Sequence, residues 1–164
     1  MAGRLTNNAQ GQRAEEIFGV RITQDYVFRA RDLGAKWPVS DYYVEINNDD
    51  RPLHFIVQIK STNQPLNRNN NLAIQVSKNK INQLSNYNAP TYLAGVDITN
   101  EIVYLIPMYR RKKTGISKIS SSFVLSKEDL ERSLINLELL QAEIIRFWRS
   151  TDTIRRKRKF NSVL

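Results

Sequence analysis

Three polar side chains that suit phosphate or metal chemistry lie on two neighbouring strand-like segments. In HFIVQIKST (54–62), apolar residues alternate so that one strand face is apolar and the other carries Gln58 and Lys60. Asp41 opens the preceding segment, DYYVEIN. If the two strands form a hairpin, the Asp41 carboxylate and the Gln58 carbonyl could share a hard cation such as Mg²⁺. Lys60 beside that cation could orient or deprotonate a water molecule, or neutralise charge on a phosphate.

The elements that must position these residues follow from the apolar spacing and the turn residues. An apolar stripe at helical spacing (Ala14, Ile17, Phe18, Ile22) predicts a first helix over 8–24. We expect further helices over 78–87, with Ser77 as N-cap, and from 127 to about 149, with Ser126 as N-cap. Strands are expected over 26–29, 41–47, 54–62, 72–76, 91–96 and 102–107. This order predicts an α/β protein with a central mixed β-sheet flanked by helices and a long C-terminal helix.

Composition narrows the class of protein. With 164 residues, 41% of them hydrophobic, the chain can form one core, and we expect a single domain over 1–150 and a basic tail over 151–164. The absence of cysteine excludes disulfides and thiolate metal sites, and a single histidine, His54, excludes a histidine-clustered zinc site. His54 itself is expected at the surface. No apolar run of ~18 residues is present and the amino terminus lacks a signal-peptide pattern, so we expect a cytoplasmic protein without a membrane span.

Charge points to a polyanionic partner. The net charge is +9, and two basic runs, 110–113 (RRKK) and 155–159 (RRKRK), account for all of it. A neutral body with two basic runs is typical of a protein that binds nucleic acid. Solvated loops and tails are the alternative interpretation of either run alone.

With these residues in this order, the sequence resembles the PD-(D/E)XK nuclease superfamily, in its Mrr-like restriction-endonuclease branch with a Q-x-K motif. The match extends to G-x-x-A-E (11–15), D-x-Y-V-E-I (41–46) and V-Q-I-K-S-T (57–62). The later pair TYLAGVD and IVYLIPM is similar to strands of small bacterial domains in this branch, some of them found in phage-defence effectors. The similarity covers about residues 8 to 108. The sequence departs from the family motif at PVSD (38–41), the segment that ends with Asp41. The Mrr-like form usually has Gly-x-Asp there.

The resemblance implies a restriction-endonuclease-like fold and a Mg²⁺-dependent endonuclease, with Mn²⁺ as a substitute. It implies that Glu15, Asp41 and Gln58 contribute to divalent-metal binding and that Lys60 is catalytic. The implied substrate is nucleic acid, with DNA favoured and little sequence specificity, in restriction or phage defence. A separate sensor protein is a further implied partner.

Several alternatives stay open at the level of sequence. Glu16 or Glu45 replaces the expected ligands if the register is off by one. Gln58 and Lys60 could instead form the solvated face of an edge strand. Because Gln58 stands where an acid would bind a metal more strongly, a catalytically inactive, nuclease-like subunit that binds nucleic acid is one rival. Another is an interaction domain that docks or forms a homodimer through the apolar residues of the helix over 127–149.

Overall fold

The computed structural model describes residues 7–34, 40–47, 49–109, 116–119 and 123–161, with the backbone alone for 116–119 and 152–161. Helix α1 (Asn7–Thr23) and the short turn η1 (Gln24–Tyr26) precede strands β1 (Phe28–Asp32), β2 (Tyr42–Ile46) and β3 (His54–Thr62). The next elements are β4 (Leu72–Val76), α2 (Lys78–Ser85), β5 (Thr91–Asp97) and β6 (Ile102–Pro107). The order is completed by β7 (Ile116–Ile119), β8 (Phe123–Leu125) and the long helix α3 (Leu130–Asn161).

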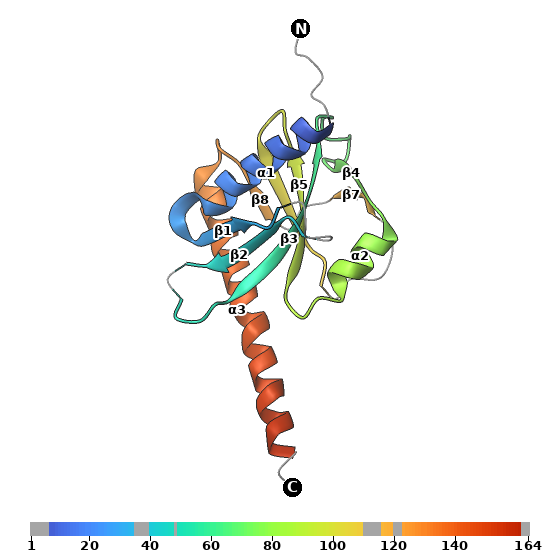
Figure 1. Cartoon of the computed structure of the whole chain (residues 1–164). Helices are drawn as coiled ribbons and strands as arrows, with labels where there is room; N and C mark the ends of the chain where they lie inside the picture. The colour runs from blue at the N-terminus through green and yellow to red at the C-terminus, as the bar shows by residue number, and fades with distance from the viewer. Residues whose placement is uncertain (1–6, 35–39, 48, 110–115, 120–122, 162–164) are drawn as a thin grey trace.

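Six strands form one mixed sheet in the order β1-β2-β3-β5-β6-β8. Strands β3 and β5 are parallel, and every other neighbouring pair in this sheet is antiparallel. Strands β4 and β7 form a separate antiparallel pair. Figure 1 shows α1 crossing the upper part of the sheet, α3 running downward from it, and α2 with β4 and β7 at the right. The predicted α/β class, with a mixed sheet flanked by helices, is confirmed.

Two apolar cores lie on opposite faces of this sheet. The first packs α1 and α3 against the sheet and includes the predicted stripe of α1 together with Phe55 and Val57 of β3. The second places α2 and β4 against Leu93 of β5 and Ile106 of β6. Because residues alternate between the two faces of a strand, Gln58 lies on the side of the second core.

Helix α3 is tied to the sheet by polar contacts as well as by apolar packing. The hydroxyls of Tyr92 and Tyr109 each donate to the Glu143 carboxylate at 2.5 Å. The indole N–H of Trp148 donates to the backbone carbonyl of His54 at 2.9 Å. These contacts fix α3 against β5 and the start of β3, the strand that carries Gln58 and Lys60.

The structure differs from the sequence-based expectations at several boundaries. Strand β1 runs to Asp32 rather than ending at residue 29, and β7 and β8 form in a segment expected to be a loop. Helix α3 continues to Asn161, so the helical backbone includes most of the segment expected to be a tail. The basic run 110–113 lies outside the described residues. In the described part of the chain, no helix is both long and apolar enough to cross a bilayer.

Candidate active site

The β2–β3 register brings Asp41 and Gln58 into direct contact. Tyr42 pairs with Val57, so Asp41, one residue earlier, lies opposite Gln58. The backbone N–H of Asp41 donates to the carbonyl of Val57 at 2.9 Å and fixes the entry to β2. One carboxylate oxygen of Asp41 then accepts two hydrogen bonds, from the Ile59 backbone N–H at 2.6 Å and from the Gln58 amide at 2.5 Å. The predicted juxtaposition of Asp41 and Gln58 is therefore present.

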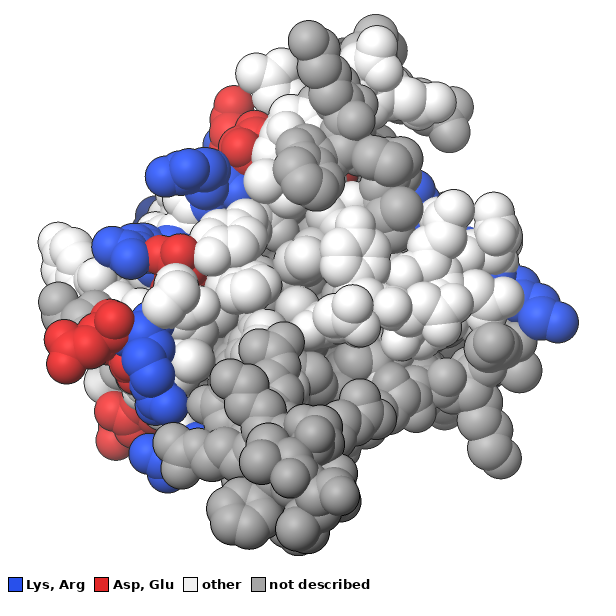
Figure 2. Space-filling view, turned by 60° about the horizontal axis from the view of Figure 1, so that its bottom comes forward, with Lys and Arg blue, Asp and Glu red and all other residues white. Residues whose placement is uncertain are grey.

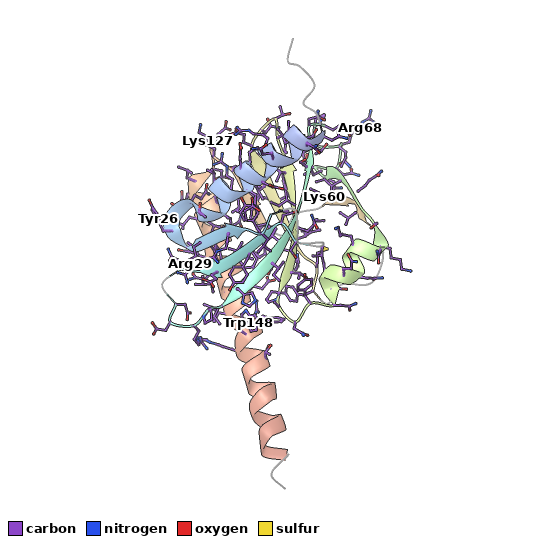
Figure 3. The ribbon with its side chains drawn as sticks, in the orientation of Figure 1. Tyr26, Arg29, Lys60, Arg68, Lys127 and Trp148 are labelled. Atoms are coloured by element: carbon purple, nitrogen blue, oxygen red, sulfur yellow. The ribbon has the colours of Figure 1, made fainter. Side chains whose placement is uncertain are left out.

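Lys60 follows Gln58 on the same strand face. Its side chain is partly exposed, whereas Gln58 is buried. Its partner on β5 is Gly95, so no side chain from the neighbouring strand covers it. Figure 3 shows Lys60 in the half of β3 nearer α1 and α2. The ammonium of Lys60 is close enough to Asp41 for its charge to lower the pKa of that carboxyl.

Glu15 lies on α1, the helix that packs on the face of the sheet opposite to Gln58. The hydroxyl of Tyr42 donates to the Glu15 backbone carbonyl at 3.3 Å, which links this turn of α1 to β2. The contact of α1 with β2 is tight at Gly19, where an added Cβ would lie 3.1 Å from the Tyr42 hydroxyl. Burial raises the pKa of Glu15, and the charges of Asp41 and Asp32 raise it further. Glu15 is thus electrostatically coupled to Asp41.

The two alternative acids have other positions. Glu16 is exposed and pairs with Arg13 on the same helix at 3.4 Å. Glu45 lies on the same face as Asp41, but four residues further along β2, or about 13 Å away. It accepts hydrogen bonds from the hydroxyl of Tyr43 at 2.7 Å and from Arg29 at 2.6 Å. Of these three acids, Glu15 is therefore the one that is electrostatically coupled to Asp41.

Sequence reasoning missed one member of the site and left another open. Asp32 ends β1 and its charge raises the pKa of both Asp41 and Glu15; the expectation that β1 ended at residue 29 hid it. Lys80 lies in the first turn of α2, whose predicted N-cap, Ser77, accepts from the Lys80 backbone N–H at 3.3 Å. Its side-chain charge lowers the pKa of Asp41. The sequence predicted a capped helix with two lysines near its start, one of them Lys80. That pattern did not show whether Lys80 binds an anion or is only a solvated charge.

Opposing effects set the pKa of the Asp41 carboxyl. Burial is the largest and raises the pKa of its carboxyl, and Asp32 adds to that rise. The Ile59 N–H, Lys60 and Lys80 act in the other direction, and the net result is a raised pKa. Acids that destabilise one another in a partly buried place are suited to a bound cation, which relieves both burial and mutual repulsion.

The fit of the residues to a metal ion is incomplete. In the segments that the structure describes, no three or more side chains of histidine, cysteine, aspartate or glutamate are grouped so as to hold a metal. Gln58 also turns its amide nitrogen, rather than its carbonyl oxygen, toward Asp41, unlike the shared-cation arrangement expected from the sequence. An amide N–H and a carboxylate attract directly, whereas two oxygens face each other only across a cation. Asp41 and Glu15 offer the carboxylate oxygens that a hard cation prefers, whereas Gln58 would have to turn its amide over to offer its carbonyl oxygen.

No family model and no curated protein matches the chain.

The raised pKa of Asp41 predicts how stability depends on pH. Between the ordinary value of 3.8 and the raised value, the folded chain keeps a proton that the unfolded chain releases. The Asp41 charge therefore destabilises the fold progressively as the pH rises through that range, and fully above it. We expect Asp41→Asn, whose amide oxygen can accept the same two hydrogen bonds, to raise the melting temperature at pH 7.

Thermal unfolding at several pH values measures this effect. The gain should shrink as the pH falls toward 3.8, and Glu15→Gln should act in the same direction. The exposed neighbour gives the control, because Glu16→Gln should leave the melting temperature nearly unchanged. A lower melting temperature for Asp41→Asn at pH 7 would show that the surroundings stabilise the charge.

Proposed function

We propose that the chain is a metal-dependent endonuclease of the restriction-endonuclease-like fold that hydrolyses phosphodiester bonds, with DNA as the favoured substrate. The observation that carries the proposal is the contact of Asp41 with Gln58 and with the backbone of Ile59, with Lys60 on the same strand face and Glu15 coupled to Asp41. The succession of α1, the β1–β2–β3 meander and a parallel β5 reached after α2 supports the fold. The sequence resemblance supports the same reaction.

Asp41 and Glu15 would hold Mg²⁺, or Mn²⁺ in its place, and Gln58 would join them with its amide turned over. When bound, such an ion polarises a phosphoryl oxygen and lowers the pKa of a coordinated water molecule. The Ile59 N–H orients the Asp41 carboxylate through its 2.6 Å hydrogen bond. Lys60 and Lys80 supply positive charge near Asp41, where they would bind phosphate oxygens and stabilise the negative charge that builds there.

The basic runs would hold the nucleic-acid backbone without selecting its sequence. The run 155–159 falls within the helical backbone of α3. Binding through such contacts releases counterions, so affinity should fall steeply with salt. This mode of binding suits a nuclease of low sequence specificity in restriction or phage defence, acting in the cytoplasm and with a separate sensor protein.

A homodimer through α3 is part of the proposal. Ile135 and Leu139, one turn apart, are 51% and 56% exposed, although α3 buries Leu137, Leu140 and Ile144 against the sheet. Pairing of these side chains across a two-fold axis would remove them from water and bring two active sites into one dimer.

A second candidate function has its own support. The amide nitrogen of Gln58 already satisfies Asp41, which is the arrangement expected of an inactive, nuclease-like subunit that binds nucleic acid. Such a protein would bind DNA equally well with and without Mg²⁺.

Cleavage of supercoiled plasmid in Mg²⁺ or Mn²⁺ tests the proposal. Wild type should nick or linearise the plasmid, and Asp41→Asn should do so at least roughly 100-fold more slowly because a charged ligand is lost. Asp41→Asn is preferred to alanine because it is expected to be the more stable protein, so unfolding does not explain a loss of activity. Glu16→Gln is the matched control and should cleave at close to the wild-type rate.

Each other outcome has a defined meaning. Equal cleavage by wild type and Asp41→Asn would remove Asp41 from the site. DNA binding without cleavage, unchanged by Mg²⁺, would favour the inactive subunit. Cleavage that persists in excess chelator would exclude a metal-dependent reaction.

A further inference from the structure

A groove of about 690 Å³ opens on the part of the sheet formed by β1, β2 and β3. Its walls include side chains from β1, β2 and β3, among them Arg29, Arg31, Tyr43, Glu45, His54 and Ile56. Apart from Glu45, which the sequence left open as an alternative ligand, these residues have no role in the proposed reaction. A groove of this size is large enough for a nucleotide-sized ligand.

The strand registers place the groove and the active site on one sheet face. Tyr43 pairs with Ile56 and with Arg31, and it lies two residues after Asp41 on β2. Two residues along a strand span about 7 Å and return to the same face. In Figure 3, Arg29 lies toward one end of these strands and Lys60 toward the other. The groove therefore lies on the sheet face that carries Asp41, Gln58 and Lys60, and its Tyr43 is two residues from Asp41.

One wall of the groove is a fixed polar network with a positive excess. Glu45 accepts from the Tyr43 hydroxyl and pairs with Arg29, which balances one charge. Burial, and after it the hydrogen bond to Glu45, raises the pKa of Tyr43 to about 12. The hydroxyl therefore stays neutral. Arg31 is exposed and makes no ion pair within the described residues, which leaves one positive charge for an anionic ligand. Figure 2 shows basic and acidic side chains alternating along the left of the molecule, the side where Figure 1 places β1 and β2.

Tyr43 of the groove also belongs to a fixed aromatic cluster. The rings of Tyr43 and His54 stack with centroids 4.9 Å apart at an interplanar angle of 24°. The ring of Trp148 lies 5.0 Å from His54 on α3, and its N–H bonds to the His54 carbonyl. His54 was expected at the surface but is half-buried among these contacts. An ordered aromatic platform loses little conformational entropy when a flat ligand packs on it.

We propose that this groove binds one unpaired nucleotide of a single-stranded segment, with its base against Tyr43 and its phosphate at Arg31. The proposal rests on the proposed nuclease function and adds the form of the substrate. Aromatic platforms combined with basic residues favour single strands because the faces of unpaired bases are accessible, whereas those of a duplex are stacked on one another. The strand would then continue from the groove past Asp41.

Fluorescence anisotropy with a labelled oligothymidylate of about ten nucleotides, in excess chelator, tests the groove without requiring cleavage. Tyr43→Leu should raise Kd roughly fivefold to 100-fold by removing the stacking surface. Arg31→Ala should weaken binding and lower the dependence of log Kd on log salt by about one phosphate contact. Tyr43→Phe keeps the ring and should bind nearly as wild type does. Arg132→Ala, near β8 at the far edge of the sheet, is the charge-matched control.

The results separate the groove from the reaction. Unchanged binding by both Arg31→Ala and Tyr43→Leu, or an equal loss in Arg132→Ala, would overturn the groove even if wild type cleaves plasmid. Equal affinity for a duplex of the same length would overturn the single-strand assignment. Loss of binding in the two groove variants alone, without any cleavage by wild type, would support the groove and reject the nuclease. If Tyr43→Leu has a much lower melting temperature than wild type, the DNA binding of the exposed Arg31→Ala variant decides whether the groove binds the strand.

Discussion

Replacing Lys60 by alanine is expected to slow phosphodiester cleavage roughly 10²- to 10⁴-fold while leaving the fold intact. The side chain is partly exposed and faces Gly95 across the parallel β3–β5 pair, so its truncation leaves no buried cavity. Lys60 is the charged residue closest in sequence to Gln58 on the strand face that carries the site. Removing it takes away charge that would stabilise the phosphate and raises the pKa of Asp41 further.

The matched control is another lysine-to-alanine change at the edge of the same region. Lys78 is exposed at the start of α2, and only Lys80 of the two lysines there affects the pKa of Asp41. Lys78→Ala should therefore cleave at close to the wild-type rate. Cleavage by Lys60→Ala at the wild-type rate would remove Lys60 from the mechanism.

Lys60→Arg distinguishes the two roles open to this residue. A guanidinium keeps the positive charge but does not deprotonate in proteins, whereas an ammonium can lose a proton when its surroundings lower its pKa. Partial activity in Lys60→Arg would assign Lys60 to charge stabilisation. Activity as low as that of the alanine variant would favour proton transfer, and the pH profile of wild type should then show an ionisation that Lys60→Arg lacks.

The central part of the site was predictable from the sequence because it depends on local geometry. Alternation in 54–62 and turn residues in 48–52 indicate a hairpin, and a hairpin places Asp41 opposite Gln58. The orientation of the Gln58 amide was not predictable. It depends on which neighbouring atom attracts it, and the hydrogen bond to Asp41 exists only in the folded sheet.

The missed elements depend on distant partners or on little burial. Strand β7 pairs with β4, forty or more residues earlier, and no local pattern in the serine-rich segment indicates that pairing. Helix α3 was expected to end near residue 149, where the apolar spacing stops. Apolar spacing reports burial rather than helicity, and the arginine and lysine residues over 155–159 are good helix formers. The Arg29 partner of Glu45 likewise emerges only from the pairing of β1 with β2.

Phe55→Ala is expected to destabilise the protein by about 3–5 kcal/mol, a large share of the stability of a typical domain. Phe55 is fully buried on β3, and its ring meets those of Phe28 on β1 and Tyr92 on β5 at 5.4 and 5.3 Å. It therefore joins three strands of the sheet from the middle one. Truncation removes the apolar area and both edge-to-face contacts, and leaves a cavity that paired strands close poorly.

Denaturant unfolding of Phe55→Ala and Phe55→Leu measures the effect, with Val20→Ala, 60% exposed on α1, as a surface control. The leucine variant should lose about 1 kcal/mol and the surface variant less than about 0.5 kcal/mol. Because Gln58 and Lys60 extend from the same strand, Phe55→Leu also tests whether core packing sets the site. Retained cleavage in a folded Phe55→Leu protein would show that the backbone hydrogen bonds of β3 to β2 and β5 are enough to position Lys60. A loss below about 1 kcal/mol in Phe55→Ala would mean that the strands close around the missing ring, and the aromatic contacts would then not account for the placement of β3.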